Sequence, residues 1–379
     1  MSIGVSIAMP KRAICGTLPS NKVTIRFYPI LFAQNCLTGW IHKPAYAHNG
    51  LSFPSSIKSD PLPKPMIPQA NNQSTTMTGT SITEMAPAKV NLYLRICGRR
   101  DDGYHLLDSA VIFTAFGDQI SLTPAATDSL TITGSFATAL TNIADNPIVT
   151  RPMANSPAAP NLCMQALTAF RDAGGVMPPV AITLDKRIPV GAGLGGGSAD
   201  AAAMLRALNA HADKSVTPET LHALATRLGA DVPACLRAHA LRMTGIGDQI
   251  SSLSASMSLS PAPDAHAFMV LANPLIPLAT KDVFAHLHSD GQGSAGDIDT
   301  LDISGLVGLG NDLEATACTL VPEIASLLSL LRQQHGCQIA AMSGSGASCF
   351  ALFDSQPASQ QACVALRKSG IWAEATHSL

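Results

Sequence analysis

The sequence predicts a two-domain α+β protein. The chain has 379 residues, of which 46% are hydrophobic and 13% charged, so it can bury more than one core. From Ala86 onward, segments with strand-like alternation interleave with segments of helical period. In the last third, the predicted order is helix, strand, strand, helix, strand, which is typical of helices packed on one side of a sheet. We place the first domain at residues 86–243 and the second, smaller domain at residues 244–379.

The composition points to a small-molecule ligand. No run of about 18 apolar residues occurs, because the most apolar candidate, FMVLANPLIPLA from Phe268, is broken by two prolines. The formal net charge of −2 gives no electrostatic reason to expect nucleic acid or an anionic membrane as a partner. The nine cysteines are scattered without C-x-x-C or metal-ligand spacing, as in a protein with reduced thiols. We expect a soluble, cytoplasmic protein without a dedicated metal site.

Residues 1–84 differ from the rest. No acidic residue occurs before Asp60, and the segment from Pro61 to Thr80 is rich in Pro, Asn, Gln, Ser and Thr, as linkers are. We interpret residues 1–84 as a disordered or non-native extension, with Met77 or Met85 as the biological start. A transit peptide, and with it an organellar location, is the alternative. No catalytic residue is expected there.

Several elements of the first domain can be placed by their patterns. A helix over 218–228 has Thr217 as N-cap, Pro218 at its first position and Gly229 at its end, and it leads to Asp231. The other expected elements are a strand at KVNLYLRI (89–96), an extended region at SAVIFTAFGDQISLTP (109–124), a helix at 160–173, a strand at VAITLDKRI (180–188) and a helix at ADAAAMLRALNAHA (199–212).

The second domain has its own series of elements. They are a helix at PEIASLLSLLRQQH (322–335) closed by Gly336, a strand at CQIAAM (337–342), a turn at SGSGAS (343–348), a strand at CFALFD (349–354), a helix and a final short strand. The segment NDLEATA (311–317) predicts the start of another helix, with Asn311 or Asp312 as its cap.

The stretch IPVGAGLGGGSADAAA (188–203) has five glycines within seven residues, followed by a helical pattern. Gly191, Gly193 and Gly196 satisfy the dinucleotide fingerprint G-x-G-x-x-G, but four residues intervene between strand and glycines and no series of βαβ units follows. A Walker P-loop is excluded because no lysine occurs in the stretch. A tight turn explains one or two glycines. Bare backbone at a helix start suits phosphate binding, with Ser198 adding a hydroxyl as N-cap or ligand.

The segment PVGAGLGGGSA (189–199) resembles the phosphate loop P-x-x-x-G-L-G-S-S-A of the GHMP kinases. It departs from that form in having glycine where many members have the first serine, so a hydroxyl role falls on Ser198 alone. Four further segments resemble the family in the same order: APAKVNLYLRICGRRDDGYHLL at Ala86, LGADVPACLRAHA at Leu228, NDLEATA at Asn311 and MSGSGASCFALFD at Met342. The five motifs span nearly all of residues 86–354, and GRRDDGYH is typical of one branch of the family.

The resemblance implies a two-domain GHMP kinase fold, with an N-terminal ATP-binding α/β domain resembling a ribosomal-protein-type domain and a ferredoxin-like C-terminal domain. In the branch concerned, ATP with Mg²⁺ phosphorylates the 2-hydroxyl of a cytidine diphosphate derivative of methylerythritol in the non-mevalonate isoprenoid pathway. Two alternatives stay open. One is a kinase of another small alcohol or sugar; the other is a silent nucleotide-binding protein, which the presence of Lys89 and Asp231 disfavours.

By the same resemblance, Asp231 in GADVP is the general base and Lys89 in PAKVN its partner. Judged by local context alone, a turn aspartate and a strand-end surface lysine are the better interpretations, and the ordered motifs reverse this preference. The expected ATP-binding residues form one continuous stretch: Pro189, Val190, Gly191, Ala192, Gly193, Leu194, Gly195, Gly196, Gly197, Ser198 and Ala199.

The acceptor is expected to contact residues from several segments. Asn91 leaves its strand on the same face as Lys89, and the resemblance places it near the substrate. Tyr104 and His105 can offer a flat face and hydrogen bonds to cytosine. Phe284 is the second stacking aromatic or an ordinary core residue. The turn residues Gly344, Ser345 and Gly346 are expected to contact phosphate, although a plain hairpin turn is the alternative.

Overall fold

The computed structural model describes residues 81–141, 161–253, 266–287, 291 and 293–379. All described residues belong to one unit of the chain, residues 67–379. The expected extension therefore lies outside the described residues, except for its end. Here the expectation is wrong, because residues 82–84 form the start of a strand that pairs with residues 120–122. No single helix in the described ranges is long and apolar enough to cross a membrane; one pair bent by 120° (314–320 and 323–332) passes that test only when joined.

The first sheet is built around one long strand, β3. Its strands are β1 (Ile82–Asn91), β2 (Arg95–Arg99), β3 (His105–Pro124), β4 (Ser129–Thr133), β5 (Val180–Asp185), β6 (Leu241–Gly245) and β7 (Gln249–Ser252). β3 pairs antiparallel with β1 and β2 along one edge and with β5 and β6 along the other. β4 extends the sheet parallel to β5, and β7 extends it antiparallel to β6.

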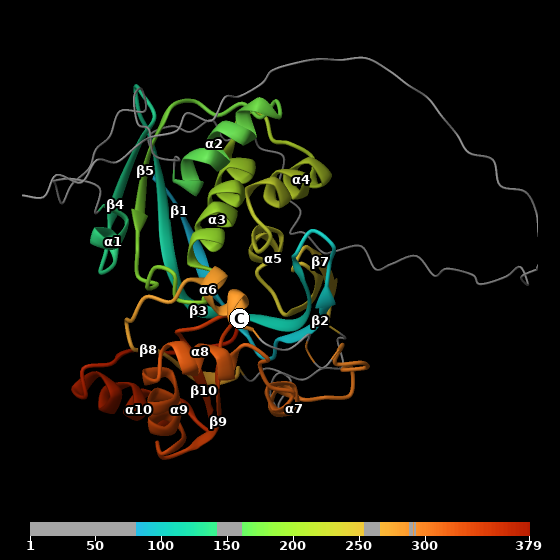
Figure 1. Cartoon of the computed structure of the whole chain (residues 1–379). Helices are drawn as coiled ribbons and strands as arrows, with labels where there is room; N and C mark the ends of the chain where they lie inside the picture. The colour runs from blue at the N-terminus through green and yellow to red at the C-terminus, as the bar shows by residue number, and fades with distance from the viewer. Residues whose placement is uncertain (1–80, 142–160, 254–265, 288–290, 292) are drawn as a thin grey trace, which may run out of the picture. The chain divides into compact units, whose positions relative to one another are not determined.

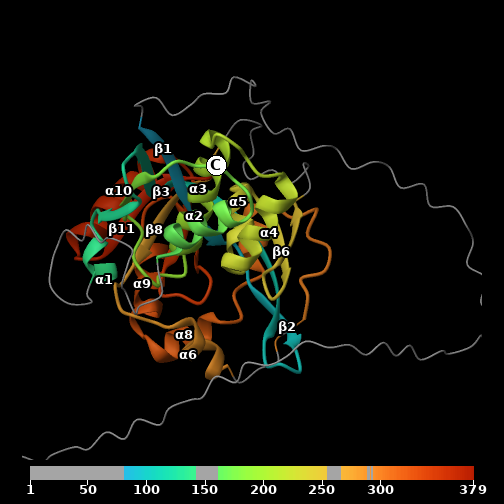
Figure 2. The same ribbon diagram turned by 90° about the horizontal axis from the view of Figure 1, so that it is seen from above.

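Helices cover one face of this sheet. They are α2 (Leu162–Asp172), α3 (Gly196–His211), α4 (Pro218–Leu228) and α5 (Val232–Arg237), while the short helix α1 (Ala137–Thr141) contacts β4. α3 packs on β1 and β3, and α2 packs on α3 (Figures 1 and 2). The alanines of α3 allow this close approach because they add little bulk. The predicted ends of α4 are confirmed: the Thr217 hydroxyl accepts a hydrogen bond from the N–H of Thr220, and Gly229 follows the last turn.

The second sheet has the strand order β11-β8-β10-β9, with all pairs antiparallel. Its strands are β8 (Phe268–Asn273), β9 (Cys337–Met342), β10 (Cys349–Phe353) and β11 (Trp372–His377). The helices in this part of the chain are α6 (Thr280–Ala285), α7 (Ile303–Gly308), α8 (Glu314–Leu320), α9 (Glu323–Arg332) and α10 (Gln356–Lys368). α9 and α10 pack on this sheet, as the resemblance to a ferredoxin-like layer implies (Figure 1).

The two sheets pack face to face, so unit 67–379 has the layer order helices, sheet, sheet, helices. Alternate residues of one strand therefore enter different cores. In β3, Val111 and Phe113 face α2 and α3, whereas Ala110 and Ile112 face the second sheet. Burial on both faces explains why these strands read as continuous apolar runs.

Three details differ from the sequence-based expectations. KVNLYLRI is two strands, because the chain leaves β1 after Asn91 and enters β2 at Arg95. The domain boundary expected after residue 243 falls inside β6, and the first sheet continues to Ser252. The cap expected at Asn311 or Asp312 is wrong, since α8 begins at Glu314 with Leu313 preceding it and no side-chain cap.

Candidate active site

A cavity of about 660 Å³ lies beside the start of α3. Its walls come from β1, β3, the glycine-rich stretch, residues 230–231, α6 and the turn after β9. Segments that are far apart in the sequence therefore meet in one place.

The glycine-rich stretch forms a loop that ends where α3 begins. Gly191, Gly193 and Gly195 have φ angles of 68°, 74° and 67°, in the left-handed region that favours glycine. Gly195 is the residue before the helix, so the expectation that Ser198 caps it is wrong; Ser198 lies in the first turn. Nine of the eleven expected ATP-binding residues line the cavity: Pro189, Val190, Gly191, Ala192, Gly193, Gly195, Gly196, Gly197 and Ser198. The other two, Leu194 and Ala199, are buried in hydrophobic cores.

Lys89 and Asp231 form an ion pair on the wall of this cavity. Lys89 Nζ donates to Asp231 Oδ2 at 2.9 Å, and the two side chains are 6% and 36% exposed. Asp231 directly precedes α5, but its carboxylate makes no capping hydrogen bond to that helix. Gly195 packs on the stem of Lys89, since a Cβ atom there would lie 3.2 Å from Lys89 Cβ. The Lys89–Asp231 ion pair is therefore packed directly against the glycine loop.

An irregularity in the strand pairing places Lys89 against the loop. The register of β1 and β3 shifts between Pro87 and Lys89, as at a β-bulge. At this point the backbone N–H of Lys89 donates to the carbonyl of Leu194 in the glycine loop, at 2.9 Å. Such irregularities are common next to active sites because they redirect a side chain.

Asn91 lines the cavity two residues farther along β1, on the same face as Lys89 as predicted. Its Nδ2 donates to Ser109 Oγ at 2.8 Å, and its backbone N–H donates to Ser343 Oγ at 3.1 Å. Its Oδ1 is buried and has no hydrogen-bond partner among the described residues. A buried acceptor without a partner is costly unless a ligand supplies the donor.

The aromatic residues divide into two groups. His105 at the start of β3 stacks on Phe284 of α6, with ring centroids 5.0 Å apart and an interplanar angle of 28°. Phe284 also lines the cavity, so it is more than a core side chain. Tyr104, by contrast, is 61% exposed and is not among the residues that line the cavity.

The turn after β9 closes the cavity beside the glycine loop. Gly344 and Ser345 line the cavity, whereas Gly346 does not. Ser345 Oγ lies 2.8 Å from Thr280 Oγ1 of α6, which also lines the cavity. The two loops touch closely, since a Cβ atom on Gly193 would lie 2.6 Å from the carbonyl oxygen of Ser343.

Sequence reasoning missed several residues that build this site. Asn311 Nδ2 donates to the carbonyls of Met342 and Gly344 at 3.0 and 2.8 Å, so its amide supports the second loop rather than capping α8. Asn311 begins NDLEATA, one of the motifs that resemble the GHMP kinases, and this is the signal that could have pointed to its role. Lys186 and Asp200 also line the cavity, although both are buried. Nothing in their local patterns predicted this.

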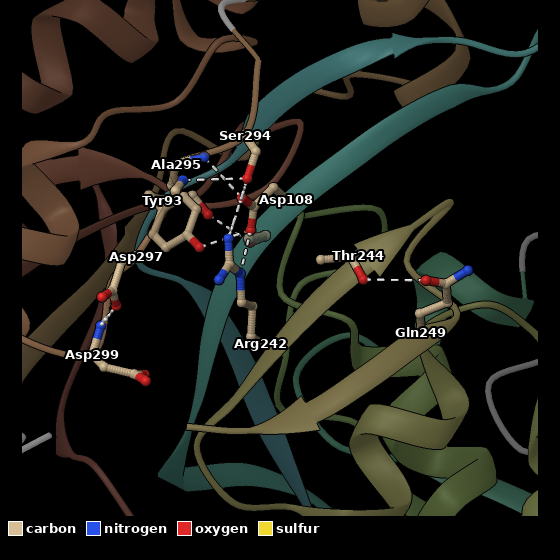
Figure 3. Close-up of polar contacts among 11 residues, drawn as sticks. Tyr93, Asp108, Arg242, Thr244, Gln249, Ser294, Ala295, Asp297 and Asp299 are labelled. Carbon is tan, nitrogen blue, oxygen red and sulfur yellow. Dashed lines mark hydrogen bonds and ion pairs between the residues drawn. The ribbon is translucent and has the colours of Figure 1, made fainter. Parts of the chain in front are cut away.

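A buried carboxylate supports the acceptor side of the cavity from behind. Asp108 lies between Leu107 and Ser109, which both line the cavity, and it is 1% exposed. Figure 3 shows the groups that converge on it. They are the Tyr93 hydroxyl (2.9 Å), Arg242 Nε and Nη2 (2.8 and 2.6 Å), the Ser294 hydroxyl (2.7 Å) and the Ala295 N–H (2.8 Å). Burial alone would raise the pKa of Asp108, but the hydrogen bonds from Arg242, Ser294, Ala295 and Tyr93 outweigh it and lower the pKa to about 2.

Taken together, the geometry suits transfer of a phosphoryl group. The N-terminus of a 16-residue helix, with a glycine loop before it, can bind an anion through backbone N–H groups. A carboxylate with a lysine partner lies beside that position, and a free amide oxygen lies on the same strand face as the lysine.

Comparison with known proteins points to the same chemistry. The family models "GHMP kinases N terminal domain" and "GHMP kinases C terminal" match residues 161–239 and 296–371. The chain is 41% identical over 299 residues to the 4-diphosphocytidyl-2-C-methyl-D-erythritol kinase of Agrobacterium fabrum, covering 76% of this chain and 93% of the relative. It is 38% identical over 323 residues to the enzyme of that name from Gluconacetobacter diazotrophicus, covering 80% and 97%.

Solved structures of GHMP kinases also resemble this chain. A crystal structure of a 4-(cytidine 5'-diphospho)-2C-methyl-D-erythritol kinase has a TM-score of 0.63 and 29% identity, covering 78% of this chain and 99% of that one. A homoserine kinase from Cytophaga hutchinsonii, 21% identical with a TM-score of 0.54, shares the fold. The chain belongs to the GHMP kinase family and, within it, to the family of the 4-diphosphocytidyl-2-C-methyl-D-erythritol kinases.

Proposed function

We propose that this protein transfers the γ-phosphoryl group of ATP to the 2-hydroxyl of 4-diphosphocytidyl-2-C-methyl-D-erythritol, in the non-mevalonate route to isoprenoid precursors. The observation that carries the proposal is the Lys89–Asp231 pair, 2.9 Å apart and packed against the glycine loop at the start of α3. The printed names of the relatives support the choice of acceptor.

The proposed reaction uses the two charged residues in different ways. As the acceptor oxygen forms a bond to the γ-phosphorus and the bond to the ADP oxygen breaks, Asp231 accepts the proton of the acceptor hydroxyl. Lys89 holds the Asp231 carboxylate in place through their ion pair and offsets charge on the transferring group. The backbone N–H groups of the loop and of the first turn of α3 bind the phosphates, with Ser198 as the hydroxyl donor.

The acceptor contacts are proposed for residues in and beside the same cavity; Asn91, Phe284, Gly344 and Ser345 line it, whereas Tyr104 and His105 do not. No described residue gives Asn91 Oδ1 a hydrogen bond, so this oxygen is available to accept one from an acceptor hydroxyl. The stacked pair His105 and Phe284 offers a flat surface for the cytosine ring. Tyr104 is exposed beside it and can cover the ring only by turning inward. Gly344 and Ser345 are the second-loop residues placed to contact phosphate.

Magnesium is proposed as the ion bound with ATP. Among the residues that the structure describes, no group of three or more His, Cys, Asp or Glu side chains is placed to form a metal site. Magnesium bound with ATP is held mainly by the triphosphate and water, so it needs few protein ligands. When bound, the ion would neutralise charge on the phosphate oxygens; Asp200 and Asp231 are the carboxylates among the residues that line the cavity.

A cytoplasmic location is proposed from the cysteines. The seven in the described ranges are all free thiols, and Cys163, Cys235, Cys349 and Cys363 are buried. Free thiols are usual in a reducing compartment.

The test is a coupled ADP-release assay of the full chain with four acceptors in parallel: the cytidyl compound, galactose, homoserine and mevalonate. We expect turnover with the cytidyl compound only. Turnover with one of the others but none with the cytidyl compound would overturn the assignment. That result would favour another kinase of the GHMP family.

A further inference from the structure

We propose that Lys186, Asp118 and Asp200 form a positioning cluster that fixes both ends of the glycine loop before ATP arrives. The proposal rests on the proposed function in one respect, namely that this loop binds the triphosphate. It assigns a role to three buried residues that the reaction itself does not use.

The cluster joins the entry and the exit of the loop. At the entry, Asp118 Oδ1 on β3 accepts hydrogen bonds from the N–H groups of Arg187 (2.6 Å) and Ile188 (2.8 Å). Lys186 Nζ donates to Asp118 Oδ2 at 2.5 Å. At the exit, the same ammonium donates to Asp200 Oδ2 on α3 at 2.6 Å. A single lysine therefore sets the spacing between the strand before the loop and the helix after it.

The backbone of the loop lies directly on this cluster. A Cβ atom on Gly196 would lie 3.0 Å from Lys186 Nζ and 3.4 Å from Asp118 Oδ2. The side chains of Lys186, Asp118 and Asp200 are 3%, 0% and 4% exposed. Because the cluster is buried beneath the first turn of α3, its geometry determines where the free N–H groups of that turn point.

Lys186 does not act as the phosphate-binding lysine of a Walker P-loop, which the stretch 188–203 lacks. Its ammonium is shared between two carboxylates, so it brings no net positive charge to a phosphate. Burial, together with the neighbouring Asp118, raises the pKa of Asp200 above its ordinary value against the opposing effect of Lys186. Cys163 of α2 and Cys235 of α5 are further titratable groups that interact with Asp200. The cluster therefore contributes geometry rather than attraction.

The loop needs such a constraint because of its composition. Ordering a residue costs on the order of 1–2 kcal/mol, and glycine loses the most freedom. A loop with five glycines in seven residues is therefore expensive to order on binding. Fixing it in advance lowers that cost and strengthens ATP binding.

The first test is calorimetric titration of the full chain with ATP, with Asp200→Asn compared to wild type. Asparagine keeps the shape and one acceptor but removes the charge, so α3 is held less firmly. We expect the Kd for ATP to rise threefold or more, while the KM for the acceptor changes less than twofold. The matched control is Asp128→Asn, which breaks the ion pair with Arg171 in the same unit but does not line the cavity. It should leave the Kd within twofold.

A rise of less than threefold in Asp200→Asn would overturn the proposal, as would an equal rise in the control. Because ATP is titrated without an acceptor, this result is independent of the acceptor's identity. A protein that binds ATP but phosphorylates none of the four acceptors would contradict the proposed function alone.

A second measurement needs no variant. Hydrogen exchange of the unchanged protein should show the amides of Arg187 and Ile188 equally protected with and without ATP, since Asp118 already binds them. If these amides exchange freely until ATP is added, the nucleotide organises the loop and the positioning cluster is refuted.

Discussion

At the scale of single residues, the Lys89–Asp231 pair combines two unlike environments. Lys89 is 6% exposed and needs a partner, because an isolated buried ammonium is very costly. Asp231 is 36% exposed and faces the cavity, so it can exchange a proton with a bound acceptor. One partner is fixed by burial and the other is accessible, as a base with a supporting cation requires.

Asp231→Asn is expected to lower kcat by roughly 10²–10⁴-fold, the usual contribution of a general base. Asparagine can still accept the hydrogen bond from Lys89, so the KM for ATP should change little. Steady-state kinetics of ADP release measure both constants. Asp213→Asn, at an exposed position outside the cavity, is the control. A variant at position 231 with near-full rate would remove the proposed base.

Lys89 and Asp231 could be predicted as catalytic only because five motifs occur in the order found in the GHMP kinases. Local context alone favoured a surface lysine and a turn aspartate. The alternation of β1 did predict that Lys89 and Asn91 share a face. It could not predict that Ser109 and Ser343, which lie 18 and 252 residues from Asn91, bind its side chain and backbone.

At the scale of elements, the two loops form one wall of the cavity. Ser343 Oγ donates to the carbonyl of Gly193, and the N–H of Ser348 donates to the carbonyl of Ala192. Neither loop can be displaced without moving the other. The patterns of the two turns were visible in the sequence, but their contact was not, because it depends on the packing of two sheets.

Gly193 and Gly191 offer a matched pair of substitutions. Both have positive φ, so alanine costs on the order of 1 kcal/mol of backbone strain at either position. At Gly191 nothing lies within 4 Å of the added Cβ, whereas at Gly193 the Ser343 carbonyl oxygen lies 2.6 Å away. Gly193→Ala should therefore raise the Kd for ATP tenfold or more and Gly191→Ala much less, measured by calorimetry. Equal effects would mean that strain alone matters.

Elements with one exposed face were the easiest to predict. α4 had its cap, proline and glycine in sequence, and all three are found. β8 was not expected as a strand, because both its faces are buried and its apolar run has no alternation. β3 is longer than the expected region, since its first residues are polar or half-buried.

At the scale of the whole unit, the Asp108 network joins the two parts of the structure. It links β3 and β6 of the first sheet to residues 294–295, which directly precede the C-terminal family match (Figure 3). The two-domain organisation could be predicted from the order of elements. The shared core between the sheets could not, since it is made of alternate residues from strands of both domains.

Asp108→Asn tests this link through pH. The folded pKa of about 2 lies below the ordinary value, so the stabilisation by the ionised group is present above about pH 4 and is lost as the pH falls towards 2. The variant should therefore lose roughly 2 kcal/mol of unfolding free energy at pH 7, and the difference from wild type should shrink near pH 2.5. Denaturant unfolding at both pH values measures this.

Asp102→Asn is the control, because its pair with Arg100 is exposed and worth little. A difference between Asp108→Asn and wild type that is the same at both pH values would show that the effect does not come from the ionised carboxylate.

β3 has a further consequence for motion. One unbroken strand carries His105 at its beginning, Ser109 and Asp108 behind the acceptor side, and Asp118 beneath the glycine loop. β1 and β2 pair along one edge and β5 and β6 along the other, but β1 pairs none of residues 114–116, and neither β5 nor β6 pairs residues 112–118. The two ends of the cavity are thus carried by one strand, and the irregularly paired segment between them is the place where their spacing can change.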